Sequence, residues 1–186
     1  MWTWYASRAA GIVSLLLLTG TLLLGIGGVT RATTTRWPRF AVGRLHRNTS
    51  MLAVAFVALH VLTAVLDGYV PIAWLDVLVP FTSAFQPFWL GLGAIALDLL
   101  LALIITSLLR ARIGLRTWRA VHWAAYACWP IAVLHGIGLG DTTTWWVLTL
   151  TLGCVAAVGI GLVRRTLTTI TAAPSDRNPT TTGTLR

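Results

Sequence analysis

Charged residues are scarce in this sequence. Only 10% of the 186 residues are charged, whereas a soluble globular domain carries about 25%. Lysine and glutamate are missing altogether, so the charges come from 14 arginines and five aspartates. Hydrophobic residues make up 56% of the chain and the mean hydropathy is +0.79. This composition excludes an ordinary soluble domain and predicts a multi-pass membrane protein, which we expect in the plasma membrane of a bacterium.

Cysteine is nearly absent as well. Cys128 and Cys154 both lie inside apolar runs, and no CxxC pair occurs. A disulfide framework and a cysteine-ligated zinc or iron–sulfur site are therefore not indicated. Buried free thiols are the simpler interpretation.

Five apolar runs are long enough to cross a bilayer, whose core needs about 20 residues of helix. They cover residues 9–29, 48–67, 88–109, 119–138 and 145–163. We therefore expect an all-α bundle of five transmembrane helices within a domain that covers residues 1–165. Residues 166–186 are rich in threonine and poor in large apolar side chains, so we expect a disordered cytoplasmic tail.

The arginines predict an orientation. They gather after the first, third and fifth runs, whereas the segments after the second and fourth runs contain aspartate and no basic residue. Basic loops stay in the cytoplasm, which places the N-terminus outside and the C-terminus inside. The net charge of +9 thus reflects membrane topology, and we expect no binding to nucleic acid. The apolar, proline-broken segment 68–87 is expected to form an outer, partly re-entrant lid.

The chain has four histidines, and all of them lie in or beside two apolar runs. An ionisable residue inside a membrane is costly and points to a function. His46 and His60 belong to the second run, and His122 and His135 to the fourth. These two helices should run in the same direction, so His46 and His122 form an inner pair and His60 and His135 an outer pair. A rise of 1.5 Å per residue separates the two levels by about 20 Å.

Two imidazoles at one level are suitable axial ligands for a haem iron, and helix bundles hold haem between facing helices. The angular pattern supports this only in part. At 100° per residue, His46 and His60 lie about 40° apart, but His122 and His135 lie about 140° apart on an ideal helix. Pro130 lies between the latter two and can kink or rewind the helix. A metal site of another kind would need further ligands, and the spans offer none near the outer pair.

Three charged residues are candidates for supporting roles. Arg47 and Arg119 lie where the propionates of an inner haem should emerge, and a guanidinium suits a carboxylate. Asp98 is the one carboxylate inside a predicted span, so we expect it to face the bundle. There it would accept a hydrogen bond from a ligand histidine or, if protonated, bond to a nearby Ser or Thr.

Three segments resemble the ferric reductase-like transmembrane domain, which is shared by ferric reductases, NADPH oxidases and the haem subunit of bacterial methionine-sulfoxide reductases. They are LHRNTSMLAVAFVALHV (45–61), LGLGAIALDLLLALIITSLLR (90–110) and TWRAVHWAAYACWPIAVLHGIG (117–138). The resemblance covers about residues 9–163. It implies two stacked b-type haems, bound by His46, His60, His122 and His135, and electron transfer across the membrane.

The resemblance also implies partners. Ferric reductases and NADPH oxidases usually continue into a flavin and nicotinamide domain, for which the short tail leaves no room. We therefore expect the membrane haem subunit of an oxidoreductase, with any flavin carried by a partner. The donor would be a separate cytoplasmic flavoprotein or a membrane quinol. The acceptor outside would be ferric iron, oxygen or a flavin-bearing protein. The alternative is a haem-free metal transporter that uses the histidines as transient ligands.

The predicted orientation can be tested by cysteine labelling in intact cells. A cysteine at position Thr34 should be shielded from an impermeant thiol reagent, because the basic loop faces the cytoplasm. A cysteine at position Thr143 should react. The opposite labelling pattern would reverse the orientation and exchange the inner and outer pairs.

Overall fold

The computed structural model describes residues 2–29, 39–68, 70–140 and 144–171, and all regular elements within these ranges are helices. The expected all-α architecture is confirmed. The elements are α1 (Trp2–Val29), α2 (Arg39–Val65), α3 (Trp74–Leu78), α4 (Pro87–Leu108), α5 (Arg110–His122), α6 (Ala125–Leu139) and α7 (Trp145–Thr171).

Four of the described helices are long and apolar enough to cross a membrane, namely α1, α2, α4 and α7. They correspond to the first, second, third and fifth predicted spans. Many large apolar side chains point outward, among them Met51, which is 67% exposed. An outward apolar surface is what lipid requires, because the solvent around the bundle is itself apolar. The chain is a multi-pass membrane protein.

The predicted fourth span is divided in the structure. Residues 119–138 fall on the end of α5 and on α6, a shorter apolar helix of 15 residues. Between them, the amides of Ala124, Tyr126 and Ala127 bond to the carbonyl three residues earlier, which is the tighter winding of a 3₁₀ turn. Pro130 follows this turn inside α6, where it has no N–H to donate to the Tyr126 carbonyl.

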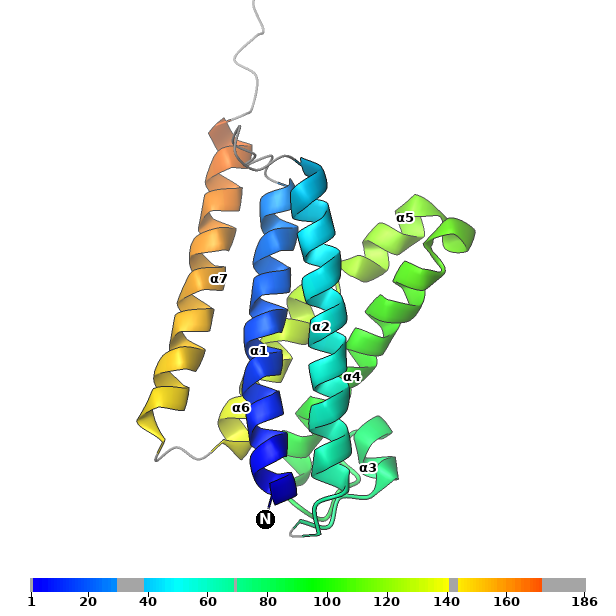
Figure 1. Cartoon of the computed structure of the whole chain (residues 1–186). Helices are drawn as coiled ribbons and strands as arrows, with labels where there is room; N and C mark the ends of the chain where they lie inside the picture. The colour runs from blue at the N-terminus through cyan, green and yellow to red at the C-terminus, as the bar shows by residue number, and fades with distance from the viewer. Residues whose placement is uncertain (1, 30–38, 69, 141–143, 172–186) are drawn as a thin grey trace, which may run out of the picture.

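The helices form two groups (Figure 1). α1 packs along α2, and α7 lies against α1, whereas α4 packs along α6. α2 and α6 run in the same direction, as expected for the two histidine-bearing helices. A buried cluster from α1, α6 and α7 joins the groups, and it contains Leu22, Ile26, Trp129, Val133, Cys154 and Val158. Within it, the indole nitrogen of Trp129 donates to Thr19 Oγ1 at 3.0 Å.

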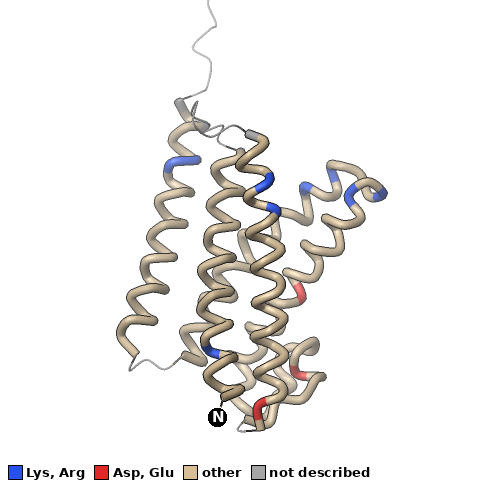
Figure 2. The backbone as a smooth tube through the Cα atoms, in the orientation of Figure 1, with Lys and Arg blue, Asp and Glu red and all other residues tan. Residues whose placement is uncertain are grey.

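Charge is segregated along the bundle (Figure 2). The arginines of α2, α5 and α7 lie toward one end, and the aspartates that follow α2 and occupy α3 lie at the other. This is the distribution expected for a protein with one basic and one acidic membrane face. Some charged residues lie outside the described part of the chain, namely those of the basic loop 30–38, Asp141 and those of the tail from residue 172 onward.

Two segments outside the predicted spans, the tail and the lid, contain helical residues. The predicted tail began at residue 166, but α7 continues to Thr171, with Thr166 and Thr168 bonding back to carbonyls three or four residues earlier. Residues 172–186 lie outside the described part of the chain. The predicted lid, 68–87, contains the short helix α3, which packs against α4. Phe81 and Gln86 there adopt positive φ values of 68° and 42°.

Candidate functional site

The structure brings the four histidines together in two pairs. The rings of His46 and His122 have centroids 6.3 Å apart with 63° between their planes. The rings of His60 and His135 are also 6.3 Å apart, with 81° between their planes. Each pair takes one ring from α2 and one from the α5–α6 segment. His46 thus lies opposite His122, and His60 opposite His135, as the depth of the histidines and the direction of their helices predict.

This separation matches that of two imidazoles sharing one metal ion. Two rings that bind a metal from opposite sides have centroids roughly 6 Å apart, because each metal–nitrogen bond is about 2.0–2.1 Å and each nitrogen lies about 1.1 Å from its ring centroid. Both pairs have this separation. The proline-associated turn before α6 resolves the angular problem of the 13-residue spacing, since both of its histidines meet a ring from α2.

Backbone carbonyls set the protonation pattern of three rings. His46 Nδ1 lies 3.0 Å from the Thr21 carbonyl oxygen, His60 Nδ1 lies 2.8 Å from that of Ser7, and His135 Nδ1 lies 2.8 Å from that of Trp89. A carbonyl can only accept, so each Nδ1 carries the proton. Nε2 then keeps its lone pair, which is the form of imidazole that ligates a metal.

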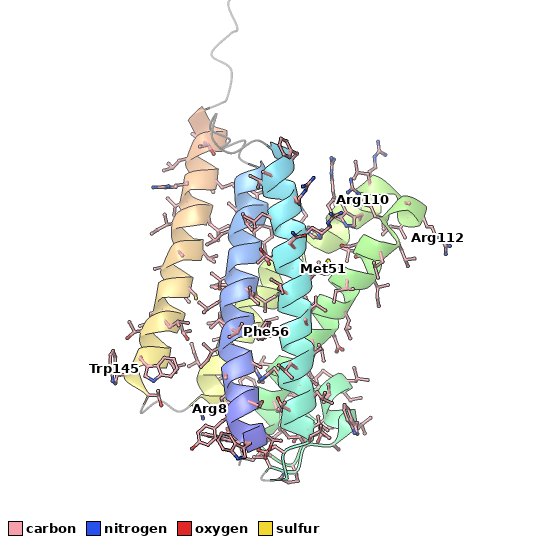
Figure 3. The ribbon with its side chains drawn as sticks, viewed as in Figure 1. Arg8, Met51, Phe56, Arg110, Arg112 and Trp145 are labelled. Atoms are coloured by element: carbon pink, nitrogen blue, oxygen red, sulfur yellow. The ribbon has the colours of Figure 1, made fainter. Side chains whose placement is uncertain are left out.

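His122 is held differently. Its Nδ1 is buried and has no hydrogen-bond partner within the described part of the chain. The ring instead stacks on Trp118, with centroids 4.7 Å apart and 26° between the planes. The guanidinium of Arg110 lies 4.6 Å from the centroid of the same indole. Arg110 lies on the side of α5 that faces α2, whereas Arg112 points away from the bundle (Figure 3).

A cavity of about 360 Å³ surrounds the outer pair and reaches the ends of α1 and α3. Its walls are mostly apolar, and its polar lining includes Arg8, Asp67 and Asp76. Asp67 accepts a hydrogen bond from Thr3 at 2.8 Å, and Asp76 accepts one from Thr82 at 2.8 Å. A largely apolar chamber with a few polar groups is typical of a ligand or cofactor site.

Asp98 requires a correction. Its side chain is exposed on α4, and no hydrogen bond joins it to a histidine among the described residues. The physical reason is that backbone carbonyls on α1 and α4 already take the Nδ1 protons of three rings. In addition, α4 leans away from α2 toward its C-terminal end (Figure 1).

The two predicted arginines lie beside the inner pair. Arg47 follows His46 on α2, and Arg119 lies one helical turn before His122; both are exposed. Sequence reasoning missed the carbonyl acceptors, because a backbone carbonyl leaves no mark in the sequence. It also missed the stacking of Trp118 on His122, although a spacing of four residues on a helix predicts such a contact.

The described residues offer no group of three or more His, Cys, Asp or Glu side chains that could hold a metal ion. A conventional metal site of protein ligands alone would need such a group. The pairs can instead supply the two axial ligands of a macrocycle-bound iron, which needs no others from the protein.

Comparison with known proteins gives one match. The family described as ferric reductase like transmembrane component matches residues 10–137. This range includes all four histidines. No curated protein and no solved structure gave a significant match.

Proposed function

The chain belongs to the family of ferric reductase like transmembrane components, and on that premise we propose that it carries electrons across the membrane by means of two b-type haems. The family places it among the membrane components of oxidoreductases. The finer statement, two haems with one at each histidine pair, is our proposal.

One observation carries the proposal. Two pairs of imidazoles, one at each level of the bundle, have the same 6.3 Å separation. Three of the four rings direct their protons to carbonyls and so keep Nε2 free. The same spacing thus occurs twice, once between rings of α2 and α5 and once between rings of α2 and α6.

The residues of the chain have separable roles in this proposal. A haem iron with two imidazole ligands supplies reversible one-electron chemistry. His46 and His122 would hold the inner group, and His60 and His135 the outer one. Arg47 and Arg119 are placed to bind carboxylates at the inner level. The walls around the outer pair are mostly apolar, and charges act more strongly in an apolar environment than in water.

We propose that this chain acts as the membrane haem component of a reductase. The described residues form a helical core with short connections. The two proposed haems would be the redox groups of this core. Electrons would reach the inner level from a cytoplasmic flavoprotein or a quinol. They would leave from the outer level to ferric iron, oxygen or a flavin-bearing protein outside.

Double substitutions test the assignment of the haems. His60→Ala with His135→Ala should halve the haem per chain and leave an inner haem that a cytoplasmic donor still reduces. His46→Ala with His122→Ala should leave an outer haem that the donor reduces slowly, because it then lies across much of a core of about 30 Å. Optical spectra and haem quantified per polypeptide measure both effects.

Crossed substitutions sharpen this experiment. Removal of His46 with His135, or of His60 with His122, should remove both haems, since each pair loses one ligand. Met51→Ala is a matched control on α2, because its side chain is 67% exposed. A purified wild-type protein without a Soret band would contradict the proposal and favour the haem-free metal transporter.

The outer segment 68–87 is proposed as the surface where the acceptor or partner binds. Trp74 on α3 is 59% exposed and Phe81 is 51% exposed, and neighbouring residues line the outer cavity. Replacing Trp74 and Phe81 with glutamine should slow reduction of the external acceptor while haem content stays the same. Trp145→Gln is the control, because Trp145 is an exposed tryptophan at the same end of the bundle (Figure 3). Unchanged reduction rates would exclude this surface.

A further inference from the structure

Three of the four histidine rings occupy the same kind of position on a neighbouring helix. In each case, the residue that supplies the carbonyl is followed four positions later by a glycine, and the ring lies against that glycine. The three sets are His46 with Thr21 and Gly25, His60 with Ser7 and Gly11, and His135 with Trp89 and Gly93. We call each carbonyl and glycine together a histidine seat.

The closeness of the rings shows why glycine is needed. A Cβ atom added to Gly93 would lie 2.4 Å from His135 Cε1, which is a steric clash. At Gly11 the corresponding distance to His60 Cε1 is 3.1 Å, and at Gly25 it is 3.6 Å to His46 Cε1. The seats are therefore graded, from one that excludes any side chain to one that tolerates a methyl group.

Helix geometry accounts for the spacing of four. In an α-helix, the carbonyl of one residue accepts the N–H of the residue four positions later, so the carbonyl and the glycine are adjacent on one helix face. A carbonyl has two lone pairs, and the second remains for the histidine. Without a Cβ at the glycine, the imidazole approaches closely enough to donate Nδ1–H to that carbonyl.

Helix α1 carries two seats in register with α2. Gly11 and Gly25 are 14 residues apart, as are His46 and His60. The helices are antiparallel (Figure 1), so Gly25 meets His46 at one level and Gly11 meets His60 at the other. The third seat lies on α4 and holds His135. His122, whose ring stacks on Trp118, is the one histidine without a seat in the described structure.

We propose that Gly11, Gly25 and Gly93 are positioning residues for the histidine ligands. Each fixes the ring plane and the Nδ1–H proton, and thereby directs Nε2 toward the opposite histidine of its pair. This inference rests on the proposed function for its consequence at haem, but the seat itself is a property of the polypeptide.

A series of Gly→Ala substitutions in the full chain tests the seats. The outer level is isolated in the His46→Ala/His122→Ala background. There, Gly93→Ala should remove most of the remaining haem, and Gly11→Ala should shift its midpoint potential with a smaller loss. Gly25→Ala, measured at the inner level in the His60→Ala/His135→Ala background, should have the weakest effect of the three.

The controls distinguish ring contact from general disturbance. Gly153→Ala and Gly159→Ala lie on α7, where an added Cβ would meet nothing within 4 Å. Both should leave the haem content and the potentials unchanged. Gly93→Ala should also leave the inner haem unchanged when the outer pair has been removed. Equal behaviour of Gly93→Ala and Gly153→Ala would overturn the proposal.

Nitrogen NMR of the histidine rings separates failure of the seat from failure of the haem assignment. In the wild-type chain, as purified and reduced, His46, His60 and His135 should each show a protonated Nδ1. Gly93→Ala should alter the signals of the outer pair and leave those of His46 unchanged. This readout applies even if the protein contains no haem. In that case the proposed function fails, but the NMR signals still show whether the glycines position the histidine rings. If Gly93→Ala does not accumulate, Gly11→Ala decides: unchanged His60 signals would overturn the seat.

Discussion

The need to satisfy an imidazole inside an apolar bundle governs much of this structure. A neutral histidine carries one N–H, and an unpaired buried donor costs about 1–3 kcal/mol. In a helix, most carbonyls are already bonded, but each keeps a second lone pair. Thr21, Ser7 and Trp89 use this second lone pair for three of the rings. The acceptors are backbone groups, which suits a membrane interior where polar side chains are expensive; at His60 the Ser7 hydroxyl also lies 3.2 Å from Nδ1.

The same hydrogen bonds give the helices different roles. α2, α5 and α6 carry the histidines, whereas α1 and α4 carry the backbone carbonyls that orient three of them. α1 orients both rings of α2, so its long packing against α2 keeps the two levels in register. Between α4 and α6, the Trp89 carbonyl accepts the Nδ1 proton of His135 and so orients one ring of the outer pair.

The two levels are not equivalent. The outer pair lies in a cavity of about 360 Å³, and both of its rings are hydrogen-bonded. The inner pair has one ring on a carbonyl and one stacked on Trp118 beneath the Arg110 guanidinium. Hydrogen bonding to a ligand histidine raises its basicity, and the inner pair has this support at one ring only. The two proposed haems would therefore differ in potential, as a directional path for electrons requires.

The sequence alone determined the membrane class, the helical architecture and the pairing of the histidines by level. Hydropathy and charge act over whole segments, and depth in the membrane follows from counting residues along parallel helices. The tertiary structure decided the features that residue counts along the helices do not determine. The turn associated with Pro130 brings His122 and His135 onto matching rings, Asp98 is exposed rather than bonded to a ligand, and carbonyls four residues before glycines hold the imidazoles. These outcomes depend on the angle and distance between helices, and a backbone carbonyl or a missing Cβ acquires its role only when a ring from another helix lies against it.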